Sequence, residues 1–201
     1  MTLASSAYRH LQDECRARGV TLVAVSKTKP VSDVLQLYEL GHRDFGENYV
    51  QELVEKQAQL PQDIRWHFIG HLQSNKVKAI ASFIHLIHSA DSLKLLKEIN
   101  KEAGKCGRVI AVLIQVHVAR EETKFGWAPV DLHHLWQELS SLSLPHIRLA
   151  GIMGMATFTE NKQQLRSEFQ QLKEAHSRLA DFLHLHPEWD TGQPLILSMG
   201  M

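Results

Sequence analysis

The sequence has little cysteine and no excess of charge of either sign. Cys15 and Cys106 are its two cysteines, one in a helical pattern and one before an expected strand, which argues against a disulfide framework. The 22 Lys and Arg residues balance 22 Asp and Glu residues, so no global field attracts nucleic acid or an anionic membrane. We therefore expect a protein of the reducing cytoplasm that binds neither.

Long apolar runs are lacking as well. The longest, Val109 to Ile114, is far shorter than the roughly 20 residues that cross a bilayer, and the amino terminus turns polar too early for a secretory signal. With 44% hydrophobic residues in 201, the chain can bury one sizeable core. No linker or low-complexity stretch interrupts it. We expect a single domain over residues 1–201, soluble and monomeric.

Short β-branched runs alternate with longer amphipathic patterns along the whole chain. The expected strands cover residues 22–27, 44–47, 66–70, 84–90, 109–118, 148–155 and 194–200. Helical patterns begin near Ser32, Asn48, Ser74, Ser92, Pro129 and Asn161, and a leading helix spans Ala4 to Arg18 and is closed by Gly19.

This strict alternation of strand and helix predicts parallel strands joined by crossover helices. Two architectures fit, an open doubly wound sheet and a closed barrel, and the nearly regular repeats favour the barrel. A complete barrel has eight strands and about 250 residues, whereas this sequence stops after the seventh strand pattern. The expected fold is therefore α/β, a (β/α)8 TIM-barrel-like arrangement that lacks its last βα unit.

Lys27 is the strongest candidate for site chemistry. In parallel β/α folds, ligands gather at the carboxyl ends of the strands, and Lys27 is the last residue of the first expected strand, directly before Thr28, Lys29 and Pro30 break it. Desolvation or a cationic neighbour such as Lys29 would favour the neutral, nucleophilic amine that forms an imine. A lone lysine at a strand end is more often a solvated surface residue, so both readings stay open on this feature alone.

Two segments at other expected strand ends carry polar and aromatic residues. Asn48, within GENYVQE, either contacts a ligand or caps the next helix. The segment WHFIGHLQSNK could seat a flat aromatic ring beside a polar helix start. Alternatively, Trp66 and Phe68 belong to the core, and His67 is a hydrogen-bonded interior residue.

Two segments near the carboxyl terminus are rich in glycine and methionine. GIMGMA, at residues 151–156, suits a backbone that lies against a planar ligand, with core packing as the alternative. LSMGM brings Ser198 and Gly200 to the end of the last strand, where barrels commonly hold phosphate through backbone amides and hydroxyl groups. A glycine after a strand is otherwise only a turn.

Taken together, AVSKTKP, FGENYVQE, WHFIGHLQSNK, GIMGMA and LSMGM, in this order and at these separations, closely resemble the pyridoxal phosphate homeostasis proteins, the YggS/PROSC family. The resemblance extends from Leu22 to Met201. It implies a barrel similar to the amino-terminal domain of alanine racemase, in which Lys27 carries pyridoxal 5'-phosphate (PLP) as an internal aldimine. The further cofactor-binding positions it implies are Asn48 and Met155 beside the cofactor, and Ser198, Gly200 and Met201 on its phosphate side.

The family pattern continues beyond SMGM. It adds a helix and an eighth strand that carries an Arg followed by a Gly-Thr phosphate-binding turn, and these residues do not occur in this sequence. We therefore expect an open seam between strands seven and one, and PLP that is absent from this chain or weakly bound to it.

The resemblance implies a PLP carrier in vitamin B6 homeostasis, which buffers the cofactor and delivers it to PLP-dependent apo-enzymes. The alternative is a small fold-type III amino-acid racemase or decarboxylase. A racemase needs a base on each face of the substrate, and the tyrosines are Tyr8, Tyr38 and Tyr49, with no committed acid/base pair among the residues. We predict no metal site, because no spacing among the thirteen histidines matches a tetrahedral one.

Overall fold

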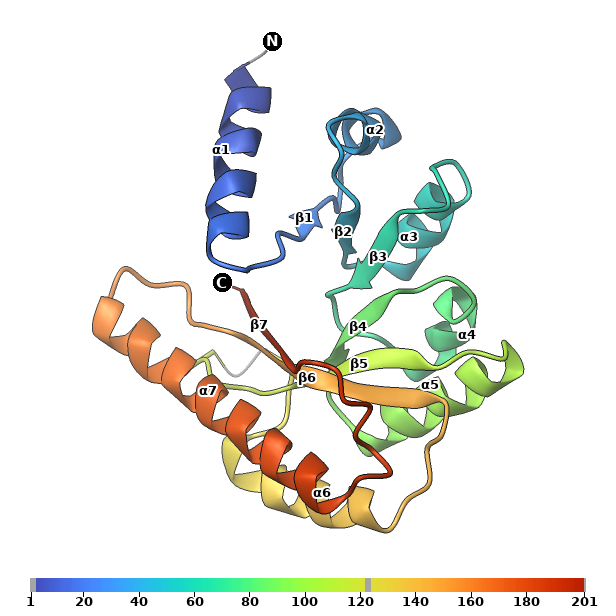
Figure 1. Ribbon diagram of the computed structural model, residues 1–201, viewed down its shortest axis with the longest axis vertical. Coiled ribbons are helices and arrows are strands. Elements are labelled where there is room, and N and C mark those ends of the chain that lie inside the picture. The colour runs from blue at the N-terminus through green and yellow to red at the C-terminus, as the bar shows by residue number, and fades with distance from the viewer. Residues whose placement is uncertain (1–2, 122–123, 201) are drawn as a thin grey trace.

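A parallel β-sheet forms the centre of the molecule (Figure 1). The computed structural model describes residues 3–121 and 124–200. Seven strands follow one another in chain order, each hydrogen-bonded in parallel to the next. The strands are β1 (Ala24–Val25), β2 (Asp44–Glu47), β3 (Arg65–Phe68), β4 (Leu86–Ala90), β5 (Ile110–Gln115), β6 (Ile147–Met155) and β7 (Ile196–Gly200). The sequence prediction of seven parallel strands is confirmed.

A helical connection follows each strand from β1 to β6, and α1 precedes β1. The α-helices are α1 (Leu3–Ala17), α2 (Val31–Glu39), α3 (Val50–Gln57), α4 (Val77–Ile80), α5 (Leu93–Lys105), α6 (Leu132–Ser140) and α7 (Lys162–Leu185), with short 3-10 helices at Ser74–Lys76 and Pro129–Asp131. Ser92 and Asn161 cap α5 and α7 through their side chains as expected, and Gly19 after α1 has a left-handed φ of 64°. None of the described helices is long and apolar enough to cross a membrane.

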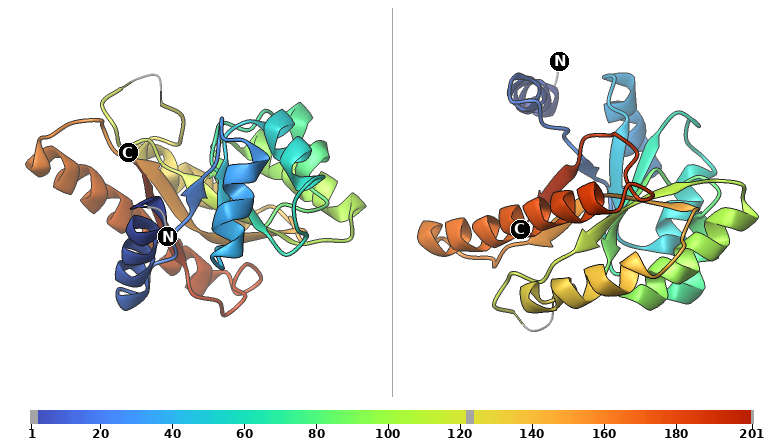
Figure 2. Two further views of the ribbon diagram at one scale, coloured as in Figure 1. Left: turned by 90° about the horizontal axis from the view of Figure 1, so that it is seen from above. Right: turned by 60° about the horizontal axis from the view of Figure 1, so that its bottom comes forward.

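The sheet is curved into a half-barrel. In a flat sheet, β4 and β7 would lie about 14 Å apart, since neighbouring strands are separated by about 4.8 Å. Here the Nδ1 atom of His88 on β4 lies 3.0 Å from the Oγ atom of Ser198 on β7, so the sheet bends round an interior. Helices α3 to α7 cover the outside (Figure 2). The edge strands β1 and β7 do not pair with each other, and the expected open seam is therefore present.

The two faces of the sheet have different cores. Trp66 and Phe68 of β3 point outwards into the large apolar layer between the sheet and its helices, where both are buried. Between them His67 points into the half-barrel, because side chains alternate along a strand. The interior holds a small apolar cluster of Leu86, Leu113, Ala150 and Met153. The core interpretation of Trp66 and Phe68 is confirmed.

Most strand boundaries differ from the expected ones by one or two residues, and β1 and β5 show the reasons for the difference. β1 pairs with β2 over two residues rather than six, because a turn begins directly after it at Ser26. β5 ends at Gln115 rather than at residue 118, and Val116 instead forms an isolated bridge with Trp127. Cys15 and Cys106 are both free thiols.

Candidate functional site

Lys27 lies in a tight turn at the carboxyl end of β1. The amide of Lys29 donates to the carbonyl of Ser26 over 3.1 Å, and Thr28 has a φ of 62°, which is unusual for a β-branched residue. Lys27 lies two residues beyond the end of β1, next to Ser26, whose hydroxyl group donates to Glu47 Oε1. It is exposed, and none of the described residues pairs with its ammonium group. The amine is therefore free at the rim of the half-barrel.

Asn48 follows β2 at the same rim. Its Oδ1 atom is buried and has no hydrogen-bond partner among the described residues. Of the two alternatives for Asn48, capping of the next helix is wrong, because Tyr49 occupies the cap position of α3 and no side chain caps it. Gly70, after β3, makes room for this arrangement, since a Cβ atom there would overlap the backbone of Asn48. The orphaned oxygen is a polar group that a bound molecule could satisfy.

The strand ends of β6 and β7 meet beside one another. Met155 pairs with Gly200 in the sheet, and the Ala156 amide donates to the Gly200 carbonyl over 2.9 Å. The Met155 side chain packs on the interior apolar cluster. Ser198 lies two residues deeper along β7, and Met201 lies outside the described residues. The carboxyl ends of the strands form one rim of the half-barrel, the carboxyl rim. Lys27 and Asn48 therefore lie on this rim at one edge of the sheet, and Met155 and Gly200 lie on it at the other edge.

The glycines of β6 pack closely against neighbouring parts of the fold. A Cβ atom at Gly154 would overlap the side chain of Leu172 on α7, so this glycine allows helix and sheet to approach closely. The packing interpretation of this segment is confirmed at Gly154, and only Met155 remains a candidate there.

A series of hydrogen-bonded polar side chains crosses the interior below the rim, and its central members Asp44, His67 and His88 are buried. The guanidinium of Arg65 binds both carboxylate oxygens of Asp44, at 2.7 and 2.5 Å. The Nε2 atom of His67 lies 3.1 Å from Asp44 Oδ1, and its Nδ1 atom lies 2.9 Å from His88 Nε2. Ser198 Oγ completes the series at 3.0 Å from His88 Nδ1. These hydrogen-bonded side chains thus connect four strands, β2, β3, β4 and β7.

The charge states of Asp44 and His88 determine part of the hydrogen-bond pattern among these side chains. Burial by itself would raise the pKa of Asp44, but hydrogen bonds from His67 and Arg65 outweigh it and lower that pKa, so the carboxylate is ionised. An ionised carboxylate only accepts, and Nε2 of His67 therefore carries a hydrogen. Burial lowers the pKa of His88 to about 3, which keeps this ring neutral. The interpretation of His67 as a hydrogen-bonded interior residue is confirmed.

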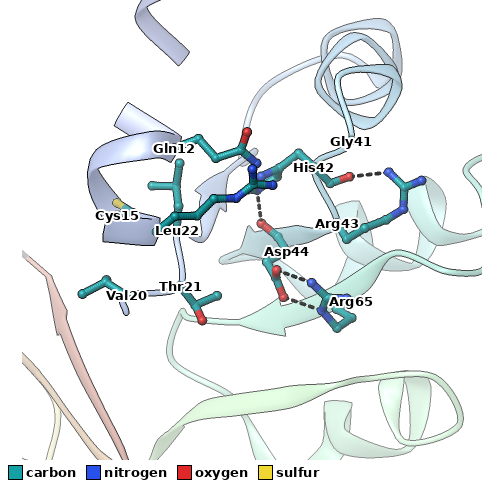
Figure 3. Close-up of a pocket in the computed structure, with 11 residues that line it drawn as sticks. Gln12, Cys15, Val20, Thr21, Leu22, Gly41, His42, Arg43, Asp44 and Arg65 are labelled. Atoms are coloured by element: carbon teal, nitrogen blue, oxygen red, sulfur yellow. Dashed lines mark hydrogen bonds and ion pairs between the residues drawn. The ribbon is translucent and has the colours of Figure 1, made fainter. Parts of the chain in front are cut away.

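A separate pocket lies at the opposite ends of the strands (Figure 3). Gln12 and Cys15 of α1 line it, together with Asp44 and Arg65, the first residues of β2 and β3. None of the sequence-predicted site residues lines this pocket. The candidate site is therefore the carboxyl rim.

Three residues near the rim were not singled out from the sequence. Lys124, in the loop after β5, donates to the Ala156 carbonyl over 2.6 Å. Lys56 of α3 donates to the Ser26 carbonyl beside Lys27, also over 2.6 Å. His88 is one of the hydrogen-bonded interior side chains. A signal existed for His88, because the pair His-Ser within an otherwise apolar strand indicates an interior polar contact; the two lysines lie in ordinary polar patterns.

Comparison with known proteins identifies the family. The model of the alanine racemase N-terminal domain family matches residues 5–189. A pyridoxal phosphate homeostasis protein of Aquifex aeolicus is 37% identical over 203 residues, which cover 98% of this chain and 85% of that protein. This chain belongs to the family of pyridoxal phosphate homeostasis proteins. The Pseudomonas aeruginosa member is 39% identical over 90% of this chain and 74% of its own length.

Solved structures agree with this family membership. PipY of Synechococcus elongatus, in a structure without PLP, has a TM-score of 0.79 and 28% identity, and the match covers 94% of this chain and 95% of PipY. The PLP-bound structure of PipY has a TM-score of 0.72 and 29% identity, covering 90% of each chain. Alanine racemase of Streptomyces lavendulae, 14% identical with a TM-score of 0.70, shares the fold. The expected barrel type is confirmed.

Proposed function

We propose that this chain binds PLP at the carboxyl rim through Lys27 and serves as a carrier in vitamin B6 homeostasis. The observation that supports this most is the free amine of Lys27, exposed at the carboxyl end of β1, in a chain that is similar to the PLP-bound PipY. When bound, PLP supplies an aldehyde that condenses with a primary amine and releases water. The buried, unpartnered Oδ1 of Asn48 indicates that the rim fits a polar ligand.

The other rim residues supply shape and polarity in this proposal. Asn48 orients the ligand by offering its free oxygen as an acceptor. The flexible thioether of Met155 packs against a flat ring. Ser198, Gly200 and Met201 form the phosphate side, where a hydroxyl group and backbone amides hold an anion. The complete proposed set is Lys27, Asn48, Met155, Ser198, Gly200 and Met201.

The carrier role is favoured over catalysis by the family and by the chemistry of the rim. The relatives in the comparison are named as homeostasis proteins. A racemase requires an acid or base on each face of the substrate. Tyr49, the tyrosine closest in sequence to a rim residue, precedes α3 and is 59% exposed, which suits a surface residue. An amine that binds an aldehyde reversibly is sufficient for a carrier.

The experiment compares PLP binding to the wild type with binding to Lys27→Ala and Lys29→Ala. Lys29 is the matched control, since it is an exposed lysine of the same turn. We expect visible absorption of bound PLP in the wild type and in Lys29→Ala, and its loss in Lys27→Ala. Undiminished absorption in Lys27→Ala would refute the proposed site.

A second experiment separates carrier from enzyme. PLP-loaded protein is incubated with a PLP-dependent apo-enzyme, and in parallel with amino acids in deuterated water. Activation of the apo-enzyme without α-proton exchange supports the carrier. Sustained exchange at catalytic rates would instead identify a small fold-type III racemase or decarboxylase.

We propose further that the chain acts in the cytoplasm as a single-domain monomer. Two free thiols suit a reducing compartment, and the balanced charge gives no attraction to nucleic acid or membrane. Light scattering on the purified protein tests the monomer: a mass near the 22.9 kDa of the chain supports it, and twice that mass contradicts it.

A further inference from the structure

A buried lysine lies beneath the turn that carries Lys27. The ammonium of Lys56, on α3, donates to the Ser26 carbonyl at 2.6 Å, to Glu47 Oε1 at 2.6 Å and to Glu52 Oε1 at 2.8 Å. The side chains of Lys56 and Glu47 are 5% and 0% exposed. Burying an ammonium group is costly unless its donors are satisfied. Here all three donors of Lys56 have an acceptor.

The same three side chains hold the residues on both sides of Lys27. The Ser26 hydroxyl donates to Glu47 Oε1 over 2.7 Å, while the Ser26 carbonyl accepts from Lys56. On the other side, the amide of Thr28 donates to Glu52 Oε1 over 2.6 Å. Thr28 has the left-handed backbone conformation, which costs free energy unless its surroundings hold it. The contacts therefore fix the turn and leave the amine of Lys27 free.

The cluster is not arranged for stability alone. The second carboxylate oxygen of Glu47, Oε2, is buried without a hydrogen-bond partner among the described residues. An unsatisfied buried oxygen destabilises the folded state. Replacing a buried ion pair by apolar side chains is often neutral or stabilising. Such an ion pair is expected where its role is to fix the position of a loop rather than to add to the stability of the fold.

We propose that Lys56, Glu47 and Glu52 are positioning residues, which hold the turn so that the Lys27 amine meets an aldehyde at the rim. This inference rests on the proposed function of Lys27. A lysine side chain has several rotatable bonds, so a fixed backbone on both sides reduces the volume that its amine explores. Small misplacements of a reacting group reduce rates strongly, by about a hundredfold for 1 Å. The three residues act through the backbone at positions 26 and 28.

The test uses Lys56→Met and Glu52→Ala, with Arg108→Met as the matched control. Arg108 also donates to two backbone carbonyls, those of Ala81 and Ile84, but next to the amino-terminal end of β4. Three quantities are measured: Tm, amide hydrogen exchange of residues 26–29 without PLP, and the rate of covalent attachment of PLP to Lys27. Attachment is followed by borohydride reduction and peptide mass spectrometry.

We expect Lys56→Met and Glu52→Ala to slow attachment by about tenfold to a hundredfold and to speed exchange at residues 26–29. Arg108→Met should lower Tm while leaving both of these rates at the wild-type value. Wild-type attachment and exchange rates in both cluster variants would overturn the inference, whatever their Tm. If Lys56→Met does not fold, Glu52→Ala decides, because the Glu52 side chain is 23% exposed.

Failure of this inference is distinguishable from failure of the proposed function. If wild-type protein attaches no PLP at Lys27, the proposed function fails. The exchange measurement then still decides whether the cluster orders the turn, since it needs no ligand. If the wild type attaches PLP and the cluster variants do so equally fast, only the positioning role fails.

Discussion

The hydroxyl group of Ser198 and the Nδ1 atom of His88 lie 3.0 Å apart across the interior of the half-barrel. This contact joins the edge strand β7 to β4, in the middle of the sheet. It forms because the sheet is curved, and the same curvature brings the strand ends together. The contact also orients the Ser198 side chain into the interior, with the hydroxyl below the rim. The proposed phosphate side thus borders the buried side chains of His88, His67 and Asp44, which are hydrogen-bonded in that order.

Ser198→Ala should weaken PLP binding. Loss of a hydrogen bond to a charged group costs about 1.5–3 kcal/mol, which corresponds to about a tenfold to hundredfold rise in Kd. Titration followed by visible absorption measures it. Ser89→Ala is the control, since Ser89 Oγ is buried without a hydrogen-bond partner among the described residues. An unchanged Kd in Ser198→Ala would remove Ser198 from the phosphate side.

The folded protein should lose stability as the solution is acidified below about pH 6.5. Burial, with smaller effects of His67 and His85, lowers the pKa of His88 from 6.5 to about 3. Between these values the unfolded chain binds a proton that the folded chain does not, so the free energy of unfolding falls as pH falls. Burial also lowers the pKa of His42 and His85, which acts in the same direction. Urea denaturation at pH 7 and pH 5 measures the effect.

His88→Asn assigns the His88 part of this pH dependence. Removing the group should flatten the dependence of the unfolding free energy on pH, by up to about 1.4 kcal/mol per pH unit. The exposed His134→Asn serves as the control for removing a histidine. Equal slopes in wild type and His88→Asn between pH 7 and pH 5 would show that His88 does not carry the effect.

Gly70→Ala should destabilise the fold and displace Asn48. A Cβ atom at Gly70 would overlap the backbone of Asn48, and overpacking of this kind costs about 1–3 kcal/mol. Gly200→Ala is the control, because its Cβ would lie 3.8 Å from Met155 Cγ, an ordinary contact. Thermal denaturation of both variants checks this. Equal Tm values for Gly70→Ala and wild type would mean that the loop after β2 adapts without cost.

The sequence was sufficient for the features that depend on local pattern. Alternation of strand and helix predicted the parallel order of β1 to β7, and strand-end positions predicted that Lys27 and Gly200 lie at the carboxyl rim. The capping signals of Ser92 and Asn161 act within three residues and were read correctly. Local chemistry fixes these features, so a single sequence is enough to expect them.

The sequence alone does not predict contacts that depend on the curvature of the sheet or on how the helices pack against it. His88 and Ser198 are separated by 110 residues, and only a bent sheet brings them together. Lys56 reads as an ordinary polar helix residue, yet the packing of α3 against the β1 turn buries it. Whether Asn48 caps the next helix or contacts a ligand stayed open in the sequence, and the capping alternative fails because α3 begins two residues later, at Val50. For His88, Ser198 and Lys56, tertiary packing decides the hydrogen-bond partner.

The most direct test of the account is the site of covalent attachment of PLP. Protein is incubated with PLP, reduced with borohydride, digested, and analysed by peptide mass spectrometry, so that every modified lysine is identified. The adduct should lie on Lys27, with Lys29 and Lys56 unmodified. An adduct distributed over the exposed lysines, or located on Lys29 or Lys124 instead, would contradict the proposed site.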